Sequence, residues 1–301
     1  MMAMMAMVAC GGTDPDTSPD GLAPVMDVQG AGATLHVRIV GELEAKKTVL
    51  LLHDGPGLAS AYLEPVIGAL VTAGTRVVIY DQRGMGSSSP ASSFALGDYA
   101  LDLEAVRDAV RAERIHIVAH GWGGLIAWAY LANQPSRVAS LTMANAWAPY
   151  AQANATAFDR VTARVTFLQN SGVIANPLPA DVGDDCGPSF KALLPAHLRD
   201  PAAPIAAELS ETPCRRSVQQ GTAAALAAGY DFVDAAIAYT GPSFVVFGKA
   251  DPLGAELGEA SVTVLPNSPG DYVVLPGTAH YPWYDSTAFV TQVAAFVASL
   301  P

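Results

Sequence analysis

Along the chain, short runs of consecutive apolar residues alternate with segments in which apolar residues recur every three or four positions. The runs "KTVLLLHDGPG" and "TRVVIYDQRG" are almost continuously apolar before their terminal loops, which is typical of strands buried on both faces of a sheet. Segments with strand character occupy residues 34–41, 47–57, 75–89, 115–120, 138–147, 242–251 and 271–280. Helical segments separate them, and this alternation predicts an α/β fold with a doubly wound, mostly parallel sheet.

Helical spacing is clearest in residues 98–113, where apolar positions fall on one face and charges on the other. The predicted apolar face consists of Leu101, Ala105, Val106, Ala109 and Val110. A helix is also predicted over residues 59–73, stopped by Gly74, and another from about residue 123. An amphipathic helix over residues 286–300 closes the chain.

The alternation of predicted strands and helices stops between residues 148 and 239. That span is rich in Ala and Pro and has helical patches but few strand signals. It predicts a helical cap, inserted into a core formed by residues 23–147 and 240–301. In open α/β sheets ligands bind beyond the carboxyl ends of the strands, so a cap there would cover a ligand site. Residues 1–22 are predicted to be a signal-like segment followed by a flexible tether.

Composition narrows the classes of partner. The chain has 301 residues, 51% of them hydrophobic, and 16 Lys and Arg against 28 Asp and Glu, a net charge of −12. Nucleic-acid binders concentrate positive charge on one face, so this balance argues against a nucleic-acid partner. Beyond the first ten residues no apolar run approaches the ~18 residues that would span a bilayer.

The N-terminal stretch "MVACGG" resembles a bacterial lipobox, in which small residues precede a cysteine that becomes lipidated, here Cys10. Lipidation would anchor the protein to a membrane of the bacterial cell envelope. The leader has no positive n-region and is short. The alternative is therefore a frayed N-terminus without lipid, on a cytoplasmic protein.

The two other cysteines, Cys186 and Cys214, both lie in the predicted cap. In an exported protein they could form a disulfide closing a loop of about 28 residues, worth ~3 kcal/mol in the chain-entropy model. Two separate buried thiols are the alternative.

Two loop motifs follow buried strands and carry a family resemblance. "HDGPG", residues 53–57, resembles the His-Gly-Gly-Pro-Gly loop of proline iminopeptidases, with Asp54 in place of a glycine. "DQRGMGSSS", residues 81–89, is similar to the Asp-Gln-Arg-Gly-x-Gly-x-Ser loop of the same family. Together they identify the chain as similar to the α/β-hydrolase superfamily over nearly all its length after residue 25, and most similar to proline iminopeptidases and their relatives.

The resemblance assigns roles at the ends of the strands. The glycine-rich loop would form an oxyanion hole, with the N–H groups of Asp54 or Gly55 and of Trp122 as donors. Asp251 and His280 follow later strands in the order that the acid and base of the family take. The carboxylate of Asp251 would orient the imidazole of His280, which would move protons.

The nucleophile position departs from the family pattern Gly-x-Ser-x-Gly. Here the strand-to-helix turn is Ala119-His120-Gly121-Trp122-Gly123, so Gly121 stands where the serine is expected. Epoxide hydrolases and haloalkane dehalogenases have a similar turn with Asp as nucleophile, and Gly121 cannot serve as that either. Glycine relieves the strain of this turn, which costs ~1–3 kcal/mol for a residue with a β-carbon.

Deleting the serine from such a triad costs about 10⁶ in turnover, or roughly 8 kcal/mol of barrier reduction, so acyl-enzyme chemistry is not expected. His120 points elsewhere on a tight turn, and Ser87, Ser88 and Ser89 lie in the preceding loop. A water in the vacated space, activated by His280, is the most physical alternative. Any hydroxyl, thiol or carboxylate oxygen in contact with the His280 imidazole would instead indicate a competent catalyst.

Three functional hypotheses follow. The first is a pseudo-hydrolase that binds a small molecule or peptide under the cap without covalent catalysis. The second is an active hydrolase of peptides or esters that uses activated water or an unrecognised nucleophile. The third is an interaction protein of the cell envelope. By resemblance, the cap glutamates Glu208 and Glu211 would grip the amino end of a peptide.

No cofactor is expected, and a metal site is disfavoured. The candidate ligands His53, Asp54, Asp81 and His120 are scattered over strand ends without a ligand spacing.

Overall fold

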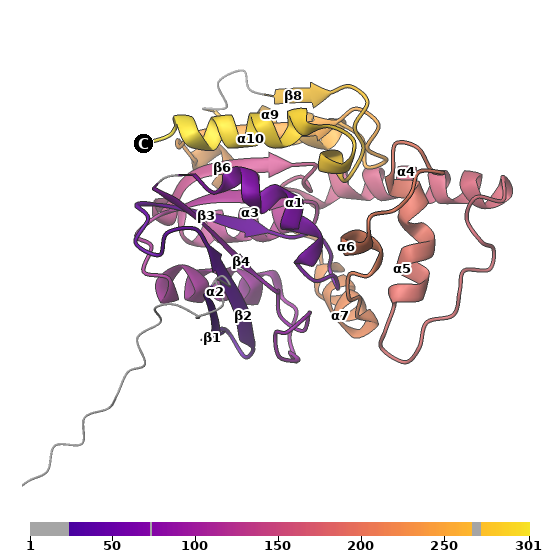
Figure 1. Cartoon of the computed structure of the whole chain (residues 1–301), viewed down its shortest axis with the longest axis horizontal. Helices are drawn as coiled ribbons and strands as arrows, with labels where there is room; N and C mark the ends of the chain where they lie inside the picture. The colour runs from indigo at the N-terminus through magenta and orange to yellow at the C-terminus, as the bar shows by residue number, and fades with distance from the viewer. Residues whose placement is uncertain (1–23, 73, 267–271) are drawn as a thin grey trace, which may run out of the picture.

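The central sheet has eight strands within residues 24–72, 74–266 and 272–301, the part of the chain that the computed structural model describes. Their order across the sheet is β1-β2-β4-β3-β5-β6-β7-β8 (Figure 1). The strands are β1 (Val25–Gln29), β2 (Thr34–Val40), β3 (Lys47–Leu52), β4 (Thr75–Tyr80), β5 (Ile115–His120), β6 (Val138–Ala144), β7 (Ser243–Gly248) and β8 (Tyr272–Leu275). The predicted fold class is confirmed: β4 to β8 and β3 pair in parallel, and β1 and β2 form an antiparallel edge.

Helices cover both faces of the sheet. On one face lie α1 (Glu64–Leu70), after the short turn η1 (Ala61–Leu63), and α10 (Thr287–Ser299), after η4 (Pro282–Tyr284). On the other face lie α2 (Leu96–Ala109), α3 (Gly123–Asn133) and α9 (Glu256–Val264), while η2 (Pro135–Arg137) links α3 to β6. Because β3, β4 and β5 are apolar on both faces, each strand end is held between two packed layers.

Three details differ from the sequence prediction. Strand β1 was not predicted, because only Val28 of its five residues is buried. The helix expected over residues 59–73 is the shorter pair η1 and α1, since Pro65 occupies a first-turn position where α1 begins. Helix α2 ends at Ala109, and Arg111 after it has a positive φ of 54°.

The predicted apolar face of α2 is partly wrong. Leu101 is 57% exposed, whereas Asp102, one position on, is fully buried. Asp102 accepts a 2.8 Å hydrogen bond from Nε of Arg83, and both side chains are about 1% exposed. The buried ion pair therefore turns α2 so that a carboxylate and not a leucine faces the core.

The cap elements lie between β6 and β7 in the sequence. They are α4 (Ala151–Asn170), α5 (Gly187–Leu193), η3 (Leu194–His197), α6 (Ala207–Ser210), α7 (Arg216–Leu226) and α8 (Val233–Ala238). Figure 1 shows α4 to α7 gathered beside one end of the sheet. The last helix, α8, packs instead on α3 and helps to cover the sheet.

The cap is tied to the loop after β3. Cys186 and Cys214 form a disulfide across a sequence separation of 28, so of the two alternatives the structure has the bonded one. Cys214 also pairs as an antiparallel bridge with Leu58, and the N–H of Arg215 donates to the carbonyl of Gly57 at 2.9 Å. The backbone after the HDGPG loop and the disulfide-bearing cap segment thus form one small paired unit.

Within the described ranges, no helix has the length and hydropathy that crossing a membrane requires. Cys10, the predicted lipidation site, lies outside those ranges, so lipidation stays a prediction.

Candidate active site

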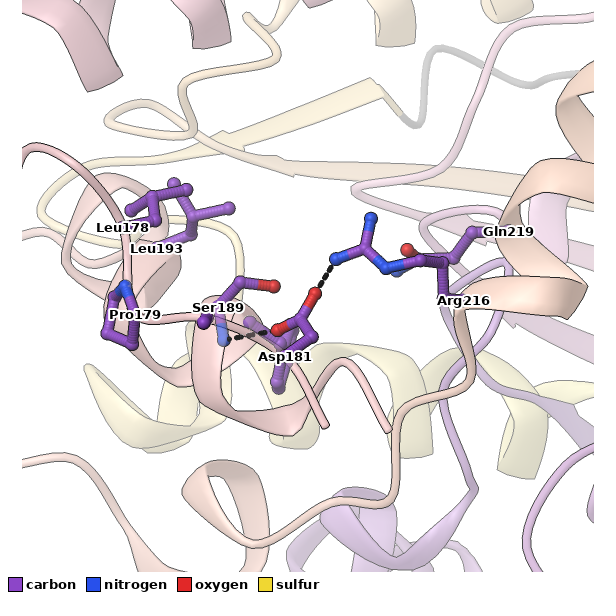
Figure 2. Close-up of a pocket in the computed structure, with 9 residues that line it drawn as sticks. Leu178, Pro179, Asp181, Ser189, Leu193, Arg216 and Gln219 are labelled. Carbon is purple, nitrogen blue, oxygen red and sulfur yellow. Dashed lines mark hydrogen bonds and ion pairs between the residues drawn. The ribbon is translucent and has the colours of Figure 1, made fainter. Parts of the chain in front are cut away.

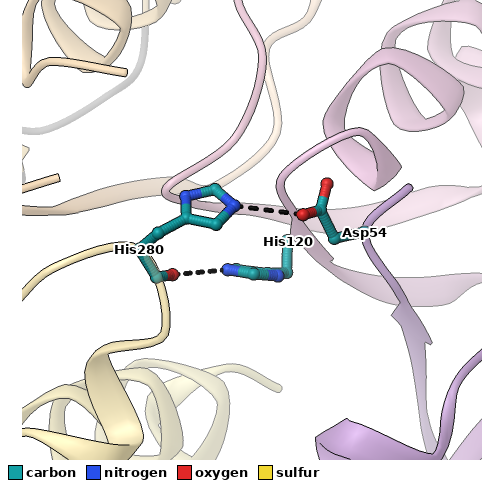
Figure 3. Close-up of side chains that lie close together, drawn as sticks. All are labelled: Asp54, His120 and His280. Carbon is teal, nitrogen blue, oxygen red and sulfur yellow. Dashed lines mark hydrogen bonds and ion pairs between the residues drawn. The ribbon is translucent and has the colours of Figure 1, made fainter. Parts of the chain in front are cut away.

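The carboxylate of Asp54 points toward the imidazole ring of His280 (Figure 3). Asp54 follows β3, whose end places it beside the turn between β5 and α3. Its Oδ1 accepts a 2.6 Å hydrogen bond from the backbone N–H of Trp122, and its Oδ2 lies 3.0 Å from Nε2 of His280. Trp122 is the N-cap of α3, so the positive end of that helix faces the negative carboxylate.

The predicted acid and base are in contact. Nδ1 of His280 lies 2.9 Å from Oδ2 of Asp251, which follows β7. The loop that carries His280 is held by Asn145 at the end of β6, whose Nδ2 donates to the carbonyls of Ala279 and His280 at 2.7 and 2.9 Å. Each ring nitrogen of His280 therefore contacts a carboxylate, Nδ1 that of Asp251 and Nε2 that of Asp54.

The space at Gly121 is not vacant, which corrects the expectation of a water there. Gly121 has a positive φ of 54°, and an added β-carbon would lie 2.0 Å from Oδ1 of Asp54 and 2.3 Å from its Cγ. The Asp54 carboxylate thus occupies the place that an elbow side chain would take. A carboxylate oxygen of Asp54 contacts the His280 imidazole, which is the kind of contact that the sequence analysis names as a sign of a competent catalyst.

Electrostatics fix the charge of this pair. Burial alone would lower the pKa of His280, but the adjacent carboxylates Asp251 and Asp54 raise that pKa to about 10. Burial pushes the pKa of Asp54 upwards, yet the bond to His280 and the nearby positive charge hold it well below its ordinary value. At neutral pH the His280 imidazole is therefore protonated beside an ionised Asp54, so His280 rests as a proton donor and not as a base.

The oxyanion-hole prediction needs correction. The N–H of Asp54 donates to the hydroxyl of Tyr62 at 2.6 Å, so it is not a free donor. The N–H of Trp122 points into the site as expected but is already bonded to Asp54. Of the three predicted donors, only the N–H of Gly55 has no hydrogen bond among the described residues.

The second family motif holds this loop in place. Nε2 of Gln82 donates to the carbonyl of His53 at 2.8 Å, and its Oε1 accepts from the indole of Trp122 at 2.9 Å. Asp81 accepts from the N–H and hydroxyl of Ser60. The hydrogen bonds of Gln82 and Asp81 therefore hold Asp54 and Trp122 in position.

A metal site was disfavoured because its candidate ligands seemed scattered, and this is wrong for two of them. Asp54, His120 and His280 present ligand atoms within 4.8 Å of one another. However, Nε2 of His120 lies 2.8 Å from the carbonyl of His280 and Nδ1 lies 3.0 Å from the hydroxyl of Tyr62. Both nitrogens of His120 are thus engaged, and burial with the charge of His280 lowers its pKa to about 4. This arrangement fits a neutral, structural imidazole better than a metal ligand.

The structure adds His197, which the sequence analysis missed. It ends η3 of the cap, and its ring centroid lies 5.5 Å from that of His280. Its carbonyl accepts from the N–H of His280, and its own buried Nδ1 has no hydrogen-bond partner among the residues that the structure describes. No motif marks this residue, because a cap histidine far along the chain is placed only by the fold.

The cap glutamates do not reach the Asp54–His280 pair. Glu208 belongs to α6 and Glu211 follows it, and both are exposed. Neither has a hydrogen bond or ion pair to Asp54, Asp251 or His280, so the role in gripping an amino end stays a prediction.

A cavity of about 430 Å³ lies in the cap (Figure 2). Its lining includes the apolar side chains of Leu178, Pro179, Phe190 and Leu193 and an ion pair between Asp181 and Arg216. Gln219, also in the lining, lies against Gly57 of the HDGPG loop, where an added β-carbon would be 2.6 Å from its Cγ. The cavity thus borders the loop that carries Asp54.

The mostly parallel sheet, the cap between β6 and β7, and an acid–imidazole pair after the last two strands define a protein of hydrolase architecture. The chain belongs to the α/β-hydrolase fold family, whose model matches residues 47–286.

Relatives fall in two groups. The chain is 38% identical over 140 residues to the putative carbamate hydrolase RutD of Variovorax paradoxus, covering 46% of this chain and 51% of that protein. It is 34% identical over 116 residues to a proline iminopeptidase of Lactobacillus delbrueckii subsp. lactis, covering 36% of this chain and 40% of that one. These matches span about half or less of the relatives' length. A proline iminopeptidase of Levilactobacillus brevis is 26% identical over 284 residues, covering 88% of this chain and 91% of that one.

Solved structures agree on the fold. VinJ superposes with a TM-score of 0.70 at 18% identity, covering 92% of this chain and 99% of that one. The proline iminopeptidase of Mycobacterium smegmatis superposes with a TM-score of 0.65 at 20% identity, covering 91% and 97%. The resemblance to proline iminopeptidases therefore extends over most of the chain.

Proposed function

We propose that this protein is a hydrolase in which the carboxylate of Asp54 replaces the elbow serine as nucleophile. The observation that carries the proposal is the position of that carboxylate, in the space of a Gly121 side chain and bonded to Trp122 and His280. Carboxylates of Asp and Glu are known enzyme nucleophiles that form covalent intermediates. On this proposal the absence of a serine at position 121 and the presence of an aspartate at position 54 are related, because the nucleophile has moved from the turn after β5 to the loop after β3.

The chemistry of a carboxylate selects the substrate. Attack on an ester or amide carbonyl would form an anhydride, which is higher in energy than the substrate. Attack on a saturated carbon with a leaving group forms an ordinary ester of Asp54. We therefore assign to the site substrates with an electrophilic saturated carbon, in place of peptides and carboxylic esters.

The same contacts serve the second step. Water attacks Cγ of the Asp54 ester, His280 takes its proton, and negative charge develops on Oδ1. The N–H of Trp122, 2.6 Å from Oδ1 at rest, is placed to hold that charge. Collapse releases the alcohol, which receives the proton from His280, and leaves Asp54 as a carboxylic acid. The proton of that acid passes to the neutral imidazole of His280, which restores the resting pair. Esterification neutralises one of the two carboxylates beside His280, which lowers the pKa of its imidazole and favours the base form.

The test is to incubate the protein with 1-bromohexane and locate the adduct by intact mass and peptide mapping. We expect one hexyl ester, on Asp54, and none in Asp54→Asn. Glu42→Gln, at an exposed carboxylate away from the cap, is the matched control and should behave as the native protein. In oxygen-18 water, hydrolysis of the ester should leave the label in the Asp54 carboxylate. An ester at another residue, or none, would refute the assignment.

A second candidate is a pseudo-hydrolase that binds a small molecule or peptide under the cap without turnover. It is favoured by the low solvent access of the site, since His280 is 2% exposed. The N–H of Trp122 is also already hydrogen-bonded to Asp54. The cavity beside the HDGPG loop supplies a place for a ligand. A thermal shift with prolyl peptides or aryl esters, without any Asp54 adduct from 1-bromohexane, would favour this candidate over the first.

For the predicted envelope location we propose membrane attachment through lipidated Cys10, on the basis of the "MVACGG" stretch alone. Detergent phase partitioning of the protein expressed in a bacterium tests it: the native chain should enter the detergent phase and Cys10→Ala should not. Equal partitioning of the native chain and Cys10→Ala would count against lipidation. It would also count against the hypothesis that the protein is an interaction protein of the cell envelope.

A further inference from the structure

A second cavity of the cap, of about 580 Å³, reaches the Cys186–Cys214 disulfide. Within the described part of the chain, its lining includes Cys214 but not the partner cysteine Cys186. Both cysteines are 2% exposed, so a reagent in solution meets a sulfur atom of the bond through this cavity. We propose that Cys214 is a site of thiol–disulfide exchange and that its reagent is a small, uncharged dithiol.

The size and charge of the cavity select this class of reagent. Its volume lies within the range of about 300–1,000 Å³ that is usual for small-molecule sites. Three carboxylates and two cations line it, so the excess charge is negative. These side chains are Asp184, Asp185, Glu211, Lys191 and Arg215. A thiol that carries a further negative group is therefore disfavoured relative to a neutral one.

The first step of the exchange opens the bond at Cys214. A thiolate of the dithiol attacks Sγ of Cys214, the bond between the two cysteine sulfurs breaks, and the electron pair goes to Sγ of Cys186, which takes up a proton. Cys214 then carries a mixed disulfide with the reagent. The direction of attack follows from access, because the sulfur that lines the cavity is the one that a reagent can reach.

Gln219 assists the second step. The other thiol of the reagent loses its proton and attacks the reagent sulfur of the mixed disulfide, and Cys214 leaves as a thiolate that is then protonated. Nε2 of Gln219 donates to Sγ of Cys214 at 3.5 Å, which stabilises that thiolate as a leaving group. In sum the cysteine disulfide gains two electrons, the dithiol is oxidised to a cyclic disulfide, and both thiol protons end on the cysteines.

The disulfide also fixes one wall of the cap cavity in Figure 2. Leu178, Pro179 and Asp181 line that cavity from residues 175–185, a segment in which most residues are exposed. An exposed segment buries little apolar surface, so its position depends on attachments at particular residues. The covalent attachment is at Cys186, directly after the segment.

The other attachments of this wall are polar contacts to the start of α7. Asp181 forms an ion pair with Arg216, and the carboxylate of Asp184 accepts from the N–H and hydroxyl of Ser217 at 2.7 and 2.8 Å. Polar contacts at partly exposed positions stabilise weakly. Reduction should therefore release the segment and open the cap cavity on that side. Neither cysteine takes part in the chemistry proposed for Asp54, so these consequences do not depend on it.

The first experiment locates the attacked sulfur in the native full-length protein. Free thiols are blocked with iodoacetamide, so that Cys10 does not contribute, and the excess is removed. The protein is then treated briefly with 2-mercaptoethanol and quenched with N-ethylmaleimide. Peptide mapping should find mercaptoethanol on Cys214 and maleimide on Cys186. The reverse pattern would overturn the assigned site, and a disulfide that resists dithiothreitol in the folded protein would overturn the exchange itself.

Two comparisons test the cavity as the route. Ser210 lines the cavity, so an indole in Ser210→Trp should fill it and slow the reaction with 2-mercaptoethanol by at least about tenfold. Ala163→Trp, at an exposed position of α4, is the matched control and should react as the native protein does. In concentrated guanidinium chloride all three proteins should react equally. Equal rates for native protein and Ser210→Trp in the folded state would overturn the route.

The reagent class is tested with 2-mercaptoethanesulfonate, which adds a negative group to the same two-carbon thiol. It should react with the folded protein more slowly than 2-mercaptoethanol does, by a larger factor than in guanidinium chloride. The same factor in both solvents would show that the charges lining the cavity do not select the reagent.

Hydrogen exchange tests the release of the wall. In Cys186→Ser/Cys214→Ser, and in the native protein after dithiothreitol, amides of residues 175–185 should lose protection by at least about tenfold, while those of β5 should not change. Unchanged protection of residues 175–185 in both samples would show that the polar contacts suffice, and would overturn the opening of the cap cavity.

Discussion

The carboxylate of Asp54 and the bare α-carbon of Gly121 fit together: a β-carbon on Gly121 would lie 2.0 Å from Oδ1 of Asp54. Both residues depart from the family pattern, one by gaining a side chain and the other by losing one. The aspartate is incompatible with the family serine at position 121, because the two side chains would overlap. The site is therefore a rearranged one, with its own resting contacts to Trp122 and His280.

Restoring both positions should recover serine chemistry. In Asp54→Gly/Gly121→Ser, the hydroxyl would have room, the Trp122 N–H would be free, and His280 would lose one of the carboxylates that protonate it. Labelling by a fluorophosphonate probe and hydrolysis of aryl esters should rise by orders of magnitude, since a triad serine is worth about 10⁶ in turnover.

The single variants serve as controls for that experiment. Gly121→Ser alone should be unlabelled and less stable, because its side chain displaces Asp54 and its φ of 54° costs about 1–3 kcal/mol. Asp54→Gly alone should also be unlabelled. Labelling of the native protein would mean that another serine is activated.

Stability should depend on pH through the Asp54–His280 pair. The pKa of His280 is raised from its ordinary 6.5 to about 10, so its stabilising contribution is complete below about 6.5 and is lost as pH rises through about 10. The pKa of Asp54 is lowered from its ordinary 3.8, so its contribution is present above that value and is lost as pH falls below it. Tm measured from pH 3 to pH 11, on the order of half-unit steps, should therefore decline at both ends.

Asp54→Asn provides the contrast for the pH profile. It removes one carboxylate from His280, so the alkaline decline in Tm should begin at lower pH, and an NMR titration of His280 should give a lower pKa. An unchanged His280 titration in Asp54→Asn would show that the two groups are not paired in solution.

The buried pair Arg83–Asp102 should be important for folding. Both side chains are 1% exposed, and Asp102 also accepts from the N–H of Ala31 at 2.8 Å. Asp102→Ala removes the fully buried carboxylate that accepts from Nε of Arg83, and should cost about 3–5 kcal/mol in the free energy of unfolding. The exposed pair Arg38–Glu64 is the control, and Glu64→Ala should cost at most about 1 kcal/mol in urea unfolding. Similar losses in the two variants would contradict the assigned burial.

The Cys186–Cys214 disulfide should stabilise the cap. Replacing both cysteines by Ala should reduce the free energy of unfolding by about 2–5 kcal/mol, the usual effect of removing a native disulfide. Denaturant unfolding followed by tryptophan fluorescence measures this. If reduction of the native protein leaves its midpoint unchanged, the bond does not constrain the chain in solution.

The sequence was sufficient for the fold because the strands β3, β4 and β5 are marked by apolar runs and their ends by two loop motifs. It was sufficient to place Asp251 and His280 together, since each follows a strand in the family order and their side chains are in contact. It failed for Asp54, which was read as a backbone donor in a glycine-rich loop. Whether a side chain on that loop reaches the next turn depends on the spacing of adjacent strands, and no local pattern encodes that spacing.

Two other errors have the same origin. The face of α2 was assigned by hydrophobicity, but Arg83 from a distant loop pairs with Asp102 and sets the rotation of the helix. His197 was overlooked because only the folding of the cap brings it to His280. In each case a contact between segments far apart in the chain overrides a local preference.

The pairing of Gly57 and Leu58 with Cys214 and Arg215 of the cap constrains how the cap can move. A cap that moved outward as a rigid body would pull the loop that carries Asp54 with it and would separate Asp54 from Trp122. Under the proposed function, a substrate therefore reaches Asp54 by rearrangement of individual cap side chains, which favours slender, uncharged molecules over bulky peptides.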